Sequence, residues 1–234
     1  MAKLILFDVD GTLVDSQAHI MAAMEVAFAD QGLVVPDRAK VLSIVGLSLP
    51  QAMQQLAPGA DTEALSDAYK ASFASSRAKA ADPAPLYPGA RAALDQLHAD
   101  GFILGTATGK SRRGLDHMIA HHGLEAHFAT LQCADDHPSK PHPSMVLTAM
   151  EDAGVAPAGT VMIGDTTFDI QMGRSAGVAT IGVSWGYHPV RDLEDCGANE
   201  IVDDFAALMD NLLARGAAWA IGPRNASGKL HRSS

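Results

Sequence analysis

The sequence is poor in cysteine and contains no long apolar run. Its two cysteines, Cys133 and Cys196, are too few for a disulfide framework or a cysteine-based zinc site. We expect both to be reduced thiols in a cytoplasmic protein. No apolar stretch approaches the roughly 20 residues of a membrane span. The apolar run at residues 3–7 is too short for a signal peptide, so we expect no membrane association.

Basic residues are also scarce relative to acidic ones. The chain has 17 Lys and Arg against 27 Asp and Glu, which gives a formal net charge of −10. Such a surface repels nucleic acid and anionic lipid, so we expect neither as a partner. It also repels small phosphorylated molecules, so a phosphate site here requires a metal ion, a lysine or helix N-termini.

The 234 residues suit one large domain, or a core with a small insert, in a monomer or homodimer. Hydrophobic residues make up 47% and charged residues 19%, which is typical of a globular protein. Residues 15–85 carry helical patterns and no convincing strand. These helices are expected at 16–31, 37–44, 48–57 and 61–80.

Strict alternation of helices and short apolar strands follows this helical region. We expect strands at 3–9, 102–107, 128–132, 160–164, 178–183 and 200–202, and helices at 89–100, 111–121, 142–153, 167–176 and 204–214. This order predicts an α/β fold with a doubly wound parallel sheet. Residues 1–14 and 86–220 would form the core, 15–85 an inserted all-helical cap, and 221–234 a flexible tail.

Polar residues gather where four of the expected strands end. They are Asp8-Val9-Asp10-Gly11-Thr12, Thr108-Gly109-Lys110, Ser139-Lys140-Pro141 and Gly164-Asp165-Thr166-Thr167-Phe168-Asp169. Each alone has an ordinary explanation, such as a turn, a helix cap or a solvated lysine. Ligands of open parallel sheets bind beyond the carboxyl ends of the strands. The four groups together therefore predict an active site at this edge.

This combination of motifs resembles the haloacid dehalogenase superfamily of phosphatases, whose core is Rossmann-like. The resemblance covers nearly the whole predicted core, with the motifs in the same order. The early helical insert is similar to the cap of the subgroup that contains phosphoglycolate phosphatases and β-phosphoglucomutases. The run Asp10-Gly-Thr-Leu-Val-Asp15-Ser16 and the pair Pro88-Gly89 most resemble the phosphoglycolate phosphatase branch.

The resemblance implies an enzyme that hydrolyses small phosphate monoesters. Asp8 would be the nucleophile that becomes an aspartyl-phosphate, and Asp10 the general acid and base. Thr108 and Gly109 would hold phosphate oxygens. Lys140 would balance the charge of Asp8 and of the transferring phosphoryl group.

The resemblance also implies a Mg²⁺ ion as cofactor. Asp8, Asp165 and the backbone carbonyl of Asp10 would be its protein ligands, because Mg²⁺ prefers hard oxygen donors. Asp169 would orient a metal-bound water. Closure of the cap over the site, hinged near residues 15–16 and 82–85, would exclude water during the first step.

Other polar and methionine residues are expected to have structural or solvated positions. Lys110, Arg112 and Arg113 indicate a solvated helix face, with the attraction of anions as the alternative. The pair His121-His122 indicates an exposed helix end. Met21, Met24 and Met53 are expected in the cap core.

Alternative functions remain open from the sequence. A response-regulator-like switch also uses aspartates, a threonine, a lysine and Mg²⁺, but the nucleophile after the first strand and the cap favour an enzyme. Dehalogenases lack the second acid at Asp10. Phosphonoacetaldehyde hydrolases use a cap lysine, and Lys40, Lys70 and Lys79 have no distinguishing context.

A phosphomutase similar to β-phosphoglucomutase shares all four motifs. Those enzymes carry an arginine after the cap loop, for the second phosphate, where this chain has Leu49. Leu47 and Leu49 therefore favour a small substrate without a second phosphate, and phosphoglycolate is one candidate.

Overall fold

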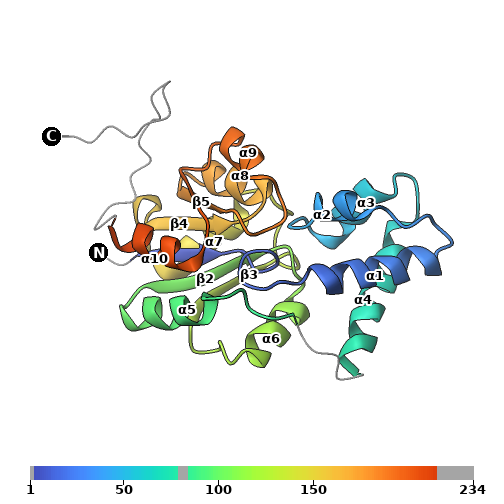
Figure 1. The fold of residues 1–234 in the computed structure, drawn as a ribbon, viewed down its shortest axis with the longest axis horizontal. Coiled ribbons are helices and arrows are strands. Elements are labelled where there is room, and N and C mark those ends of the chain that lie inside the picture. The colour runs from blue at the N-terminus through green and yellow to red at the C-terminus, as the bar shows by residue number, and fades with distance from the viewer. Residues whose placement is uncertain (1–2, 79–83, 215–234) are drawn as a thin grey trace.

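The computed structural model describes residues 3–78 and 84–214. Its centre is a sheet of six parallel strands in the order β3-β2-β1-β4-β5-β6 (Figure 1). The strands are β1 (Leu4–Phe7), β2 (Ile103–Thr108), β3 (Phe128–Cys133), β4 (Thr160–Gly164), β5 (Ala179–Val183) and β6 (Glu200–Val202). The central strand β1 is wholly apolar and fully buried, as expected where helices cover both faces.

Helices cover both faces of this sheet. One face packs against α5 (Ala90–Ala99), α6 (Arg112–His121) and α10 (Phe205–Ala214). The other face packs against α7 (Ser144–Ala153) and α8 (Thr167–Ser175). The predicted doubly wound α/β fold is therefore confirmed.

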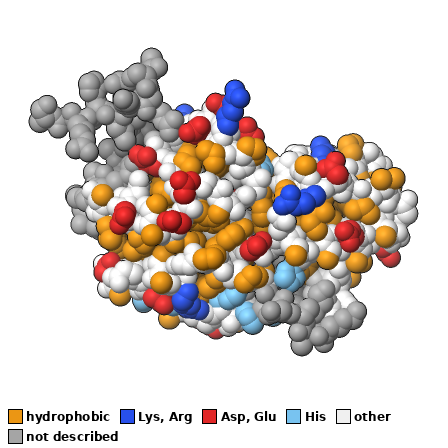
Figure 2. Space-filling view, viewed as in Figure 1, with side chains coloured by type: hydrophobic (Ala, Val, Ile, Leu, Met, Phe, Trp, Pro, Cys, Tyr) orange, Lys and Arg blue, Asp and Glu red, His pale blue; other side chains and the backbone are white. Residues whose placement is uncertain are grey.

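Four helices lie between β1 and α5 in the chain and form a separate lobe, the cap, visible at the right of Figures 1 and 2. They are α1 (Gln17–Asp30), α2 (Arg38–Leu42), α3 (Leu49–Leu56) and α4 (Thr62–Ala78). The cap has its own apolar cluster, which contains Met24 and Met53 and is joined by Met21, as expected. Phe168 and Tyr187 of the core also pack against it, so cap and core are in contact.

The two chain segments that enter and leave the cap lie side by side. Val14 and Leu86 form an isolated antiparallel β-bridge, and the Asp15 N–H donates to the Pro85 carbonyl at 2.9 Å. The cap is therefore joined to the core through one paired connection. Residues 79–83 and the expected tail at 221–234 lie outside the described residues.

Two short elements were not expected from the sequence. They are α9 (Val190–Asp195) and the 3₁₀ turn Pro157–Gly159. In α9 only Leu193 is buried, so the segment has too few apolar positions to show a helical period. Within the described chain, no helix is long and apolar enough to cross a membrane.

Candidate functional site

The sheet order brings the predicted residues together. Strand β1 lies between β2 and β4, so Asp8, Thr108 and Asp165 sit at the carboxyl ends of three neighbouring strands. Lys140 comes from the loop after β3, and Asp169 from the first turn of α8. The loops that follow parallel strands thus supply one shared site, as sheet topology requires.

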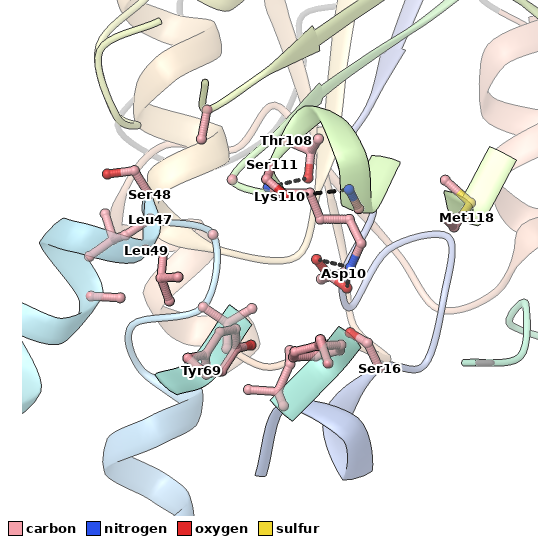
Figure 3. Close-up of a pocket in the computed structure, with 18 of the residues that line it drawn as sticks. Asp10, Ser16, Leu47, Ser48, Leu49, Tyr69, Thr108, Lys110, Ser111 and Met118 are labelled. Carbon is pink, nitrogen blue, oxygen red and sulfur yellow. Dashed lines mark hydrogen bonds and ion pairs between the residues drawn. The ribbon is translucent and has the colours of Figure 1, made fainter. Parts of the chain in front are cut away.

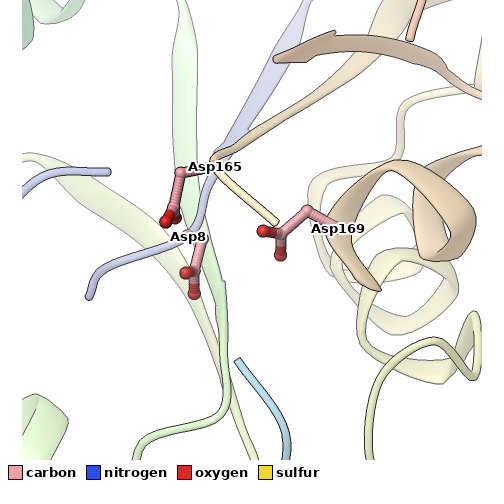
Figure 4. Close-up of side chains that lie close together, drawn as sticks. All are labelled: Asp8, Asp165 and Asp169. Atoms are coloured by element: carbon pink, nitrogen blue, oxygen red, sulfur yellow. The ribbon is translucent and has the colours of Figure 1, made fainter. Parts of the chain in front are cut away.

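Three carboxylates form a buried cluster (Figure 4). One oxygen each of Asp8, Asp165 and Asp169 lies within 4.8 Å of the others. The buried Lys140 Nζ donates to Asp8 Oδ1 and to Asp169 Oδ1, both at 2.7 Å. One ammonium thus faces three carboxylates with almost no access to water, which leaves an excess of negative charge when all are ionised.

The second oxygen of Asp169 belongs to a capping box. The N–H and the hydroxyl of Thr166 donate to Asp169 Oδ2 at 3.0 and 2.7 Å, which fixes the start of α8. Both oxygens of Asp169 therefore have donors, and the carboxylate is held toward Lys140.

Both oxygens of Asp165 are also held. The Thr12 hydroxyl donates to Oδ1 at 2.9 Å, and the Tyr187 N–H donates to Oδ2 at 2.9 Å. Asp8 Oδ2 differs, because it is buried and has no hydrogen-bond partner among the described residues. A cation is the natural partner for such an oxygen.

Burial shifts the protonation of this cluster. Burial raises the pKa of Asp8 to about 7, although Lys140 pulls it down. Burial, followed by the charges of Asp8 and Asp169, raises the pKa of Asp165 well above its usual value. Burial also opposes the charge of Lys140, but Asp169 and Asp8 outweigh it and raise its pKa. The amine is therefore an ammonium, while the carboxylates lack a second positive charge.

The donor set fits a hard divalent cation. It consists of carboxylate oxygens, one of which has no partner, and the cluster would carry an excess of negative charge once its carboxylates ionise. Such a site suits Mg²⁺ better than a thiolate-binding metal, because Mg²⁺ prefers oxygen ligands.

Asp10 lies apart from this cluster and lines the cavity (Figure 3). Lys110 Nζ donates to both of its carboxylate oxygens, at 2.6 and 2.8 Å. The expectation that Lys110 is solvated is therefore wrong, since only 20% of its side chain is exposed. The side chain reaches the loop after β1 from the segment before α6, a contact between residues 100 positions apart that no local pattern reveals.

The neighbouring basic residues behave differently from Lys110. Arg113 is exposed, as expected, whereas Arg112 donates to Asp136 and to the Leu131 carbonyl. His121 is exposed, as expected for the histidine pair. His122 is only partly exposed, because its Nε2 forms a hydrogen bond with the Ala84 carbonyl at 3.0 Å.

Sequence reasoning missed the loop after β5. Its Tyr187 N–H holds Asp165, and its Tyr187 hydroxyl bonds Ser16 Oγ at 3.0 Å. A side chain at Gly186 would collide with Asp165, so the glycine is required for this close approach. The only signal in the sequence was a glycine shortly after a strand, which is too common to indicate a site.

A cavity of about 590 Å³ lies between core and cap. Its core wall includes Asp8, Asp10 and Thr108, the last residue of β2. The Thr108 hydroxyl accepts the Lys110 N–H at 3.2 Å, so it lies at the start of the turn that leads into α6. The predicted nucleophile, acid–base residue and phosphate-binding threonine therefore share one cavity.

The cap approaches this wall through the loop before α3. The Ser48 N–H donates to Ser139 Oγ at 2.7 Å. A Cβ atom on Gly109 would lie 2.6 Å from the carbonyl oxygens of Gly46 and Leu47. The glycine next to Thr108 therefore allows the cap backbone to sit directly against the core.

Comparisons with known proteins agree with this geometry. Residues 5–183 match the family model of the haloacid dehalogenase-like hydrolases. The chain is 36% identical over 226 residues to "Probable phosphatase IndB" of Dickeya dadantii (strain 3937), which covers 94% of this chain and 95% of that protein. It is 30% identical over 234 residues to "Phosphoglycolate phosphatase" of Agrobacterium fabrum (strain C58 / ATCC 33970), with 94% and 98% covered.

A solved structure shows the same architecture. A predicted phosphatase from Clostridium acetobutylicum superimposes with a TM-score of 0.81 at 26% identity, covering 92% of this chain and 99% of that one. The match to a hydrolase family argues against the receiver-like switch. The chain belongs to the haloacid dehalogenase-like hydrolase family, in its helical-capped, phosphoglycolate phosphatase-like group.

Proposed function

We propose that this chain is a Mg²⁺-dependent phosphatase that hydrolyses small phosphate monoesters through an aspartyl-phosphate on Asp8. The observation that carries the proposal is the buried Asp8 Oδ2 without a partner, beside Lys140 and on the wall of the cavity. The names of the relatives from Dickeya and Agrobacterium support a phosphatase.

Asp8, Asp165 and the backbone carbonyl of Asp10 would hold the Mg²⁺ ion, as expected from the sequence. When bound, Mg²⁺ offsets the negative charge of the cluster and of the phosphoryl group. The contacts of Asp169 with Lys140 and Thr166 support a role in positioning the lysine, in addition to the expected role of orienting a metal-bound water.

In the first step, a carboxylate oxygen of Asp8 attacks phosphorus while the ester bond to the leaving alcohol breaks. Asp10 donates a proton to the departing alkoxide, and Lys140, Thr108 and the N–H of Gly109 hold phosphate oxygens. In the second step, Asp10 takes a proton from water, which attacks the aspartyl-phosphate. Inorganic phosphate leaves and Asp8 is restored.

Phosphoglycolate is one candidate substrate, since it appears in the name of the Agrobacterium relative. The phosphomutase alternative is less well supported, because Leu49 occupies the position of the arginine expected for a second phosphate. A cytoplasmic location is part of the proposal and rests on the two free cysteines, Cys133 and Cys196.

The test measures phosphate release from p-nitrophenyl phosphate and phosphoglycolate, with Mg²⁺ or EDTA. We expect activity with Mg²⁺, none with EDTA, and a loss of more than about 1,000-fold in Asp8→Asn. Asp30→Asn, an exposed carboxylate of α1, is the control. Rapid acid quench with labelled substrate should trap phosphate on Asp8. Full activity in EDTA, or in an Asp8→Asn sample free of deamidation, would contradict the proposal.

A further inference from the structure

The cavity between core and cap is polar at one end and apolar at the other. Its core wall carries Asp8, Asp10, Thr108 and Lys110, where the phosphate would bind. Its cap wall is dominated by apolar and aromatic side chains (Figure 3). They include Ile20, Met24, Leu47, Leu49, Tyr69 and Phe73.

The size of the cavity exceeds what a two-carbon acid needs. A volume of about 590 Å³ corresponds to about 20 water molecules. It falls within the range of about 300–1,000 Å³ typical of pockets for much larger ligands. With phosphoglycolate bound at the core wall, the partly exposed side chains of the cap wall, Leu49, Tyr69 and Phe73, would still face water. The hydrophobic effect favours a ligand that covers this wall.

Two aromatic rings line the cap wall. Tyr69 and Phe73 lie one turn apart on α4, with ring centroids 5.0 Å apart and planes inclined at 51°. Burial, followed by the charge of Asp10, raises the pKa of Tyr69, so its phenol is neutral. Aromatic rings that meet in such offset or edge-to-face arrangements attract one another beyond the effect of burial alone. The wall therefore suits a planar, uncharged ring.

The cap loop nearest the phosphate end offers no cation. This loop approaches Gly109 and carries Leu47 into the cavity, and Leu49, the first residue of α3, lines the cavity beside it. The described cap residues of the cavity include one lysine, Lys70, which is exposed and pairs with Asp67 at 3.2 Å. His19 of the cap also lines the cavity.

On the core side, Lys110 is engaged by Asp10. Arg113 and His117 of α6 also line the cavity and are exposed. Arg113 and His117 could therefore contact polar substituents of a ligand at the solvent-exposed edge of the cavity. The leucines beside the phosphate end do not suit the carboxylate of phosphoglycolate, because a buried anion requires a partner.

We propose that the cavity takes phosphate monoesters whose alcohol part is a planar apolar ring joined to the phosphate by a short chain. This inference rests on the phosphatase function proposed above and narrows its substrate class. The ring would lie against Tyr69 and Phe73, and the short chain would pass beneath Leu47 and Leu49.

The first test compares kcat/KM for 2-phenylethyl phosphate, ethyl phosphate and phosphoglycolate with Mg²⁺. All three esters release a primary alkoxide. Differences in kcat/KM therefore report mainly on how the cavity recognises the rest of the alcohol part. We expect 2-phenylethyl phosphate to exceed both others by about 10- to 100-fold, the gain from burying a phenyl-sized group. An equal or higher value for phosphoglycolate would overturn the inference.

Variants of the cap wall locate the effect. Tyr69→Leu and Phe73→Leu keep a branched apolar side chain but remove a ring, and each should lower the ratio of kcat/KM for 2-phenylethyl phosphate to that for ethyl phosphate about 3- to 10-fold. Leu49→Arg should shift the preference toward phosphoglycolate, whereas Leu49→Met should not. Val34→Ala, a cap side chain that is 91% exposed and outside the cavity, is the control. If the ratio changed in neither Tyr69→Leu nor Phe73→Leu, the proposed contact of a substrate ring with these side chains would be refuted.

A binding measurement separates this inference from the phosphatase function. Calorimetry with Mg²⁺ would compare 3-phenylpropylphosphonate, propylphosphonate and 3-phosphonopropionate, which match the three esters but cannot be hydrolysed. We expect the phenyl compound to bind most tightly. If the protein were an active phosphatase but bound 3-phosphonopropionate most tightly, the inference about the ring would be refuted and the proposed phosphatase function would stand. The expected binding order without turnover of any phosphate ester would refute the proposed function while supporting the cavity assignment.

Discussion

Among single residues, the pairing of Asp10 with Lys110 links two segments of the site. Both oxygens of the Asp10 carboxylate accept from one ammonium, and the pair lies mostly out of solvent, with 13% and 20% of the two side chains exposed. Partly buried pairs of this kind fix geometry more than they add stability. Lys110 therefore sets where the proposed acid–base carboxylate lies in the cavity.

Replacement of Asp10 tests its proposed role. General acid–base catalysis contributes about 10²–10⁴-fold, so Asp10→Asn should reduce hydrolysis of ethyl phosphate by about that factor. Release of p-nitrophenol should fall less, because that leaving group needs little protonation. Steady-state kinetics on both substrates measure this. Equal losses would indicate that Asp10 has a structural role in the turn at Gly11.

Replacement of Lys110 tests its positioning role. Lys110→Met removes the donor to Asp10 and should lower kcat by about 10- to 100-fold, since small misplacements of a catalytic group have effects of this size. Lys110→Arg should recover part of the loss. Arg191→Met, an exposed basic residue of α9 outside the cavity, is the comparison. A change in KM alone would mean that Lys110 contacts substrate without placing Asp10.

The sequence predicts site residues well where they directly follow a strand. Asp8, Thr108 and Asp165 could be placed because an expected strand ends next to each of them. Lys110 could not, because a long side chain can point to solvent or across the site with the same local sequence. Tyr187 could not, because it contributes its backbone N–H, which any residue provides.

At the level of elements, the loop that leads into α3 connects the cap with the catalytic edge. Ser48 donates to Ser139, which lies one residue before Lys140, and the backbone at Gly46 and Leu47 packs on Gly109. The position of the cap is thereby coupled to two of the segments that would bind phosphate.

Loss of the Ser139 hydroxyl should weaken this contact. A hydrogen bond contributes about 0.5–1.5 kcal/mol, so Ser139→Ala should raise KM about 2- to 10-fold with a smaller change in kcat. Ser43→Ala is the control, because the Ser43 hydroxyl bonds Lys40 within the cap. Unchanged KM in Ser139→Ala would show that this contact does not contribute to closure of the cap.

The helices of the cap could be predicted from their spacing, but the cavity beneath them could not. Its volume depends on where α1, α4 and the loop before α3 lie relative to the core, which is set by contacts between segments distant in the chain. The expectation of a small substrate without a second phosphate came from Leu47 and Leu49 and from the resemblance to the phosphoglycolate phosphatase branch. Tyr69 and Phe73, on the last of the cap helices, complete the wall.

For the molecule as a whole, the buried carboxylates oppose folding when no cation is bound. The pKa of Asp8 is about 7 in the fold, against about 3.9 in an unfolded chain. The folded state therefore binds more protons between these values. It follows that, without metal, the free energy of unfolding decreases as the pH rises from about 4 to 7.

Mg²⁺ should reverse this dependence, because it replaces the proton. Its affinity should rise about 10-fold per pH unit below pH 7, and the increase in Tm on adding Mg²⁺ should be larger at pH 8 than at pH 5.5. Thermal unfolding with and without Mg²⁺ at both pH values measures this. In Asp8→Asn the dependence on pH should become smaller, and the part that comes from the buried Asp165 should remain. An equal increase in Tm at both pH values would show that Mg²⁺ does not compete with a proton for the Asp8 carboxylate.

The paired connection between Val14 and Leu86 has a consequence for protein engineering and for evolution. The chain enters the cap at residues 14–15 and leaves it at residues 85–86, and these two segments are hydrogen-bonded to each other. The cap is therefore inserted between two paired segments, which together form a short stem. Any module whose termini lie a few ångströms apart could be grafted onto that stem without moving β1 or α5. Exchange of caps between members of the family would then change substrate preference, provided that the new cap keeps the backbone contacts with Gly109 and Ser139.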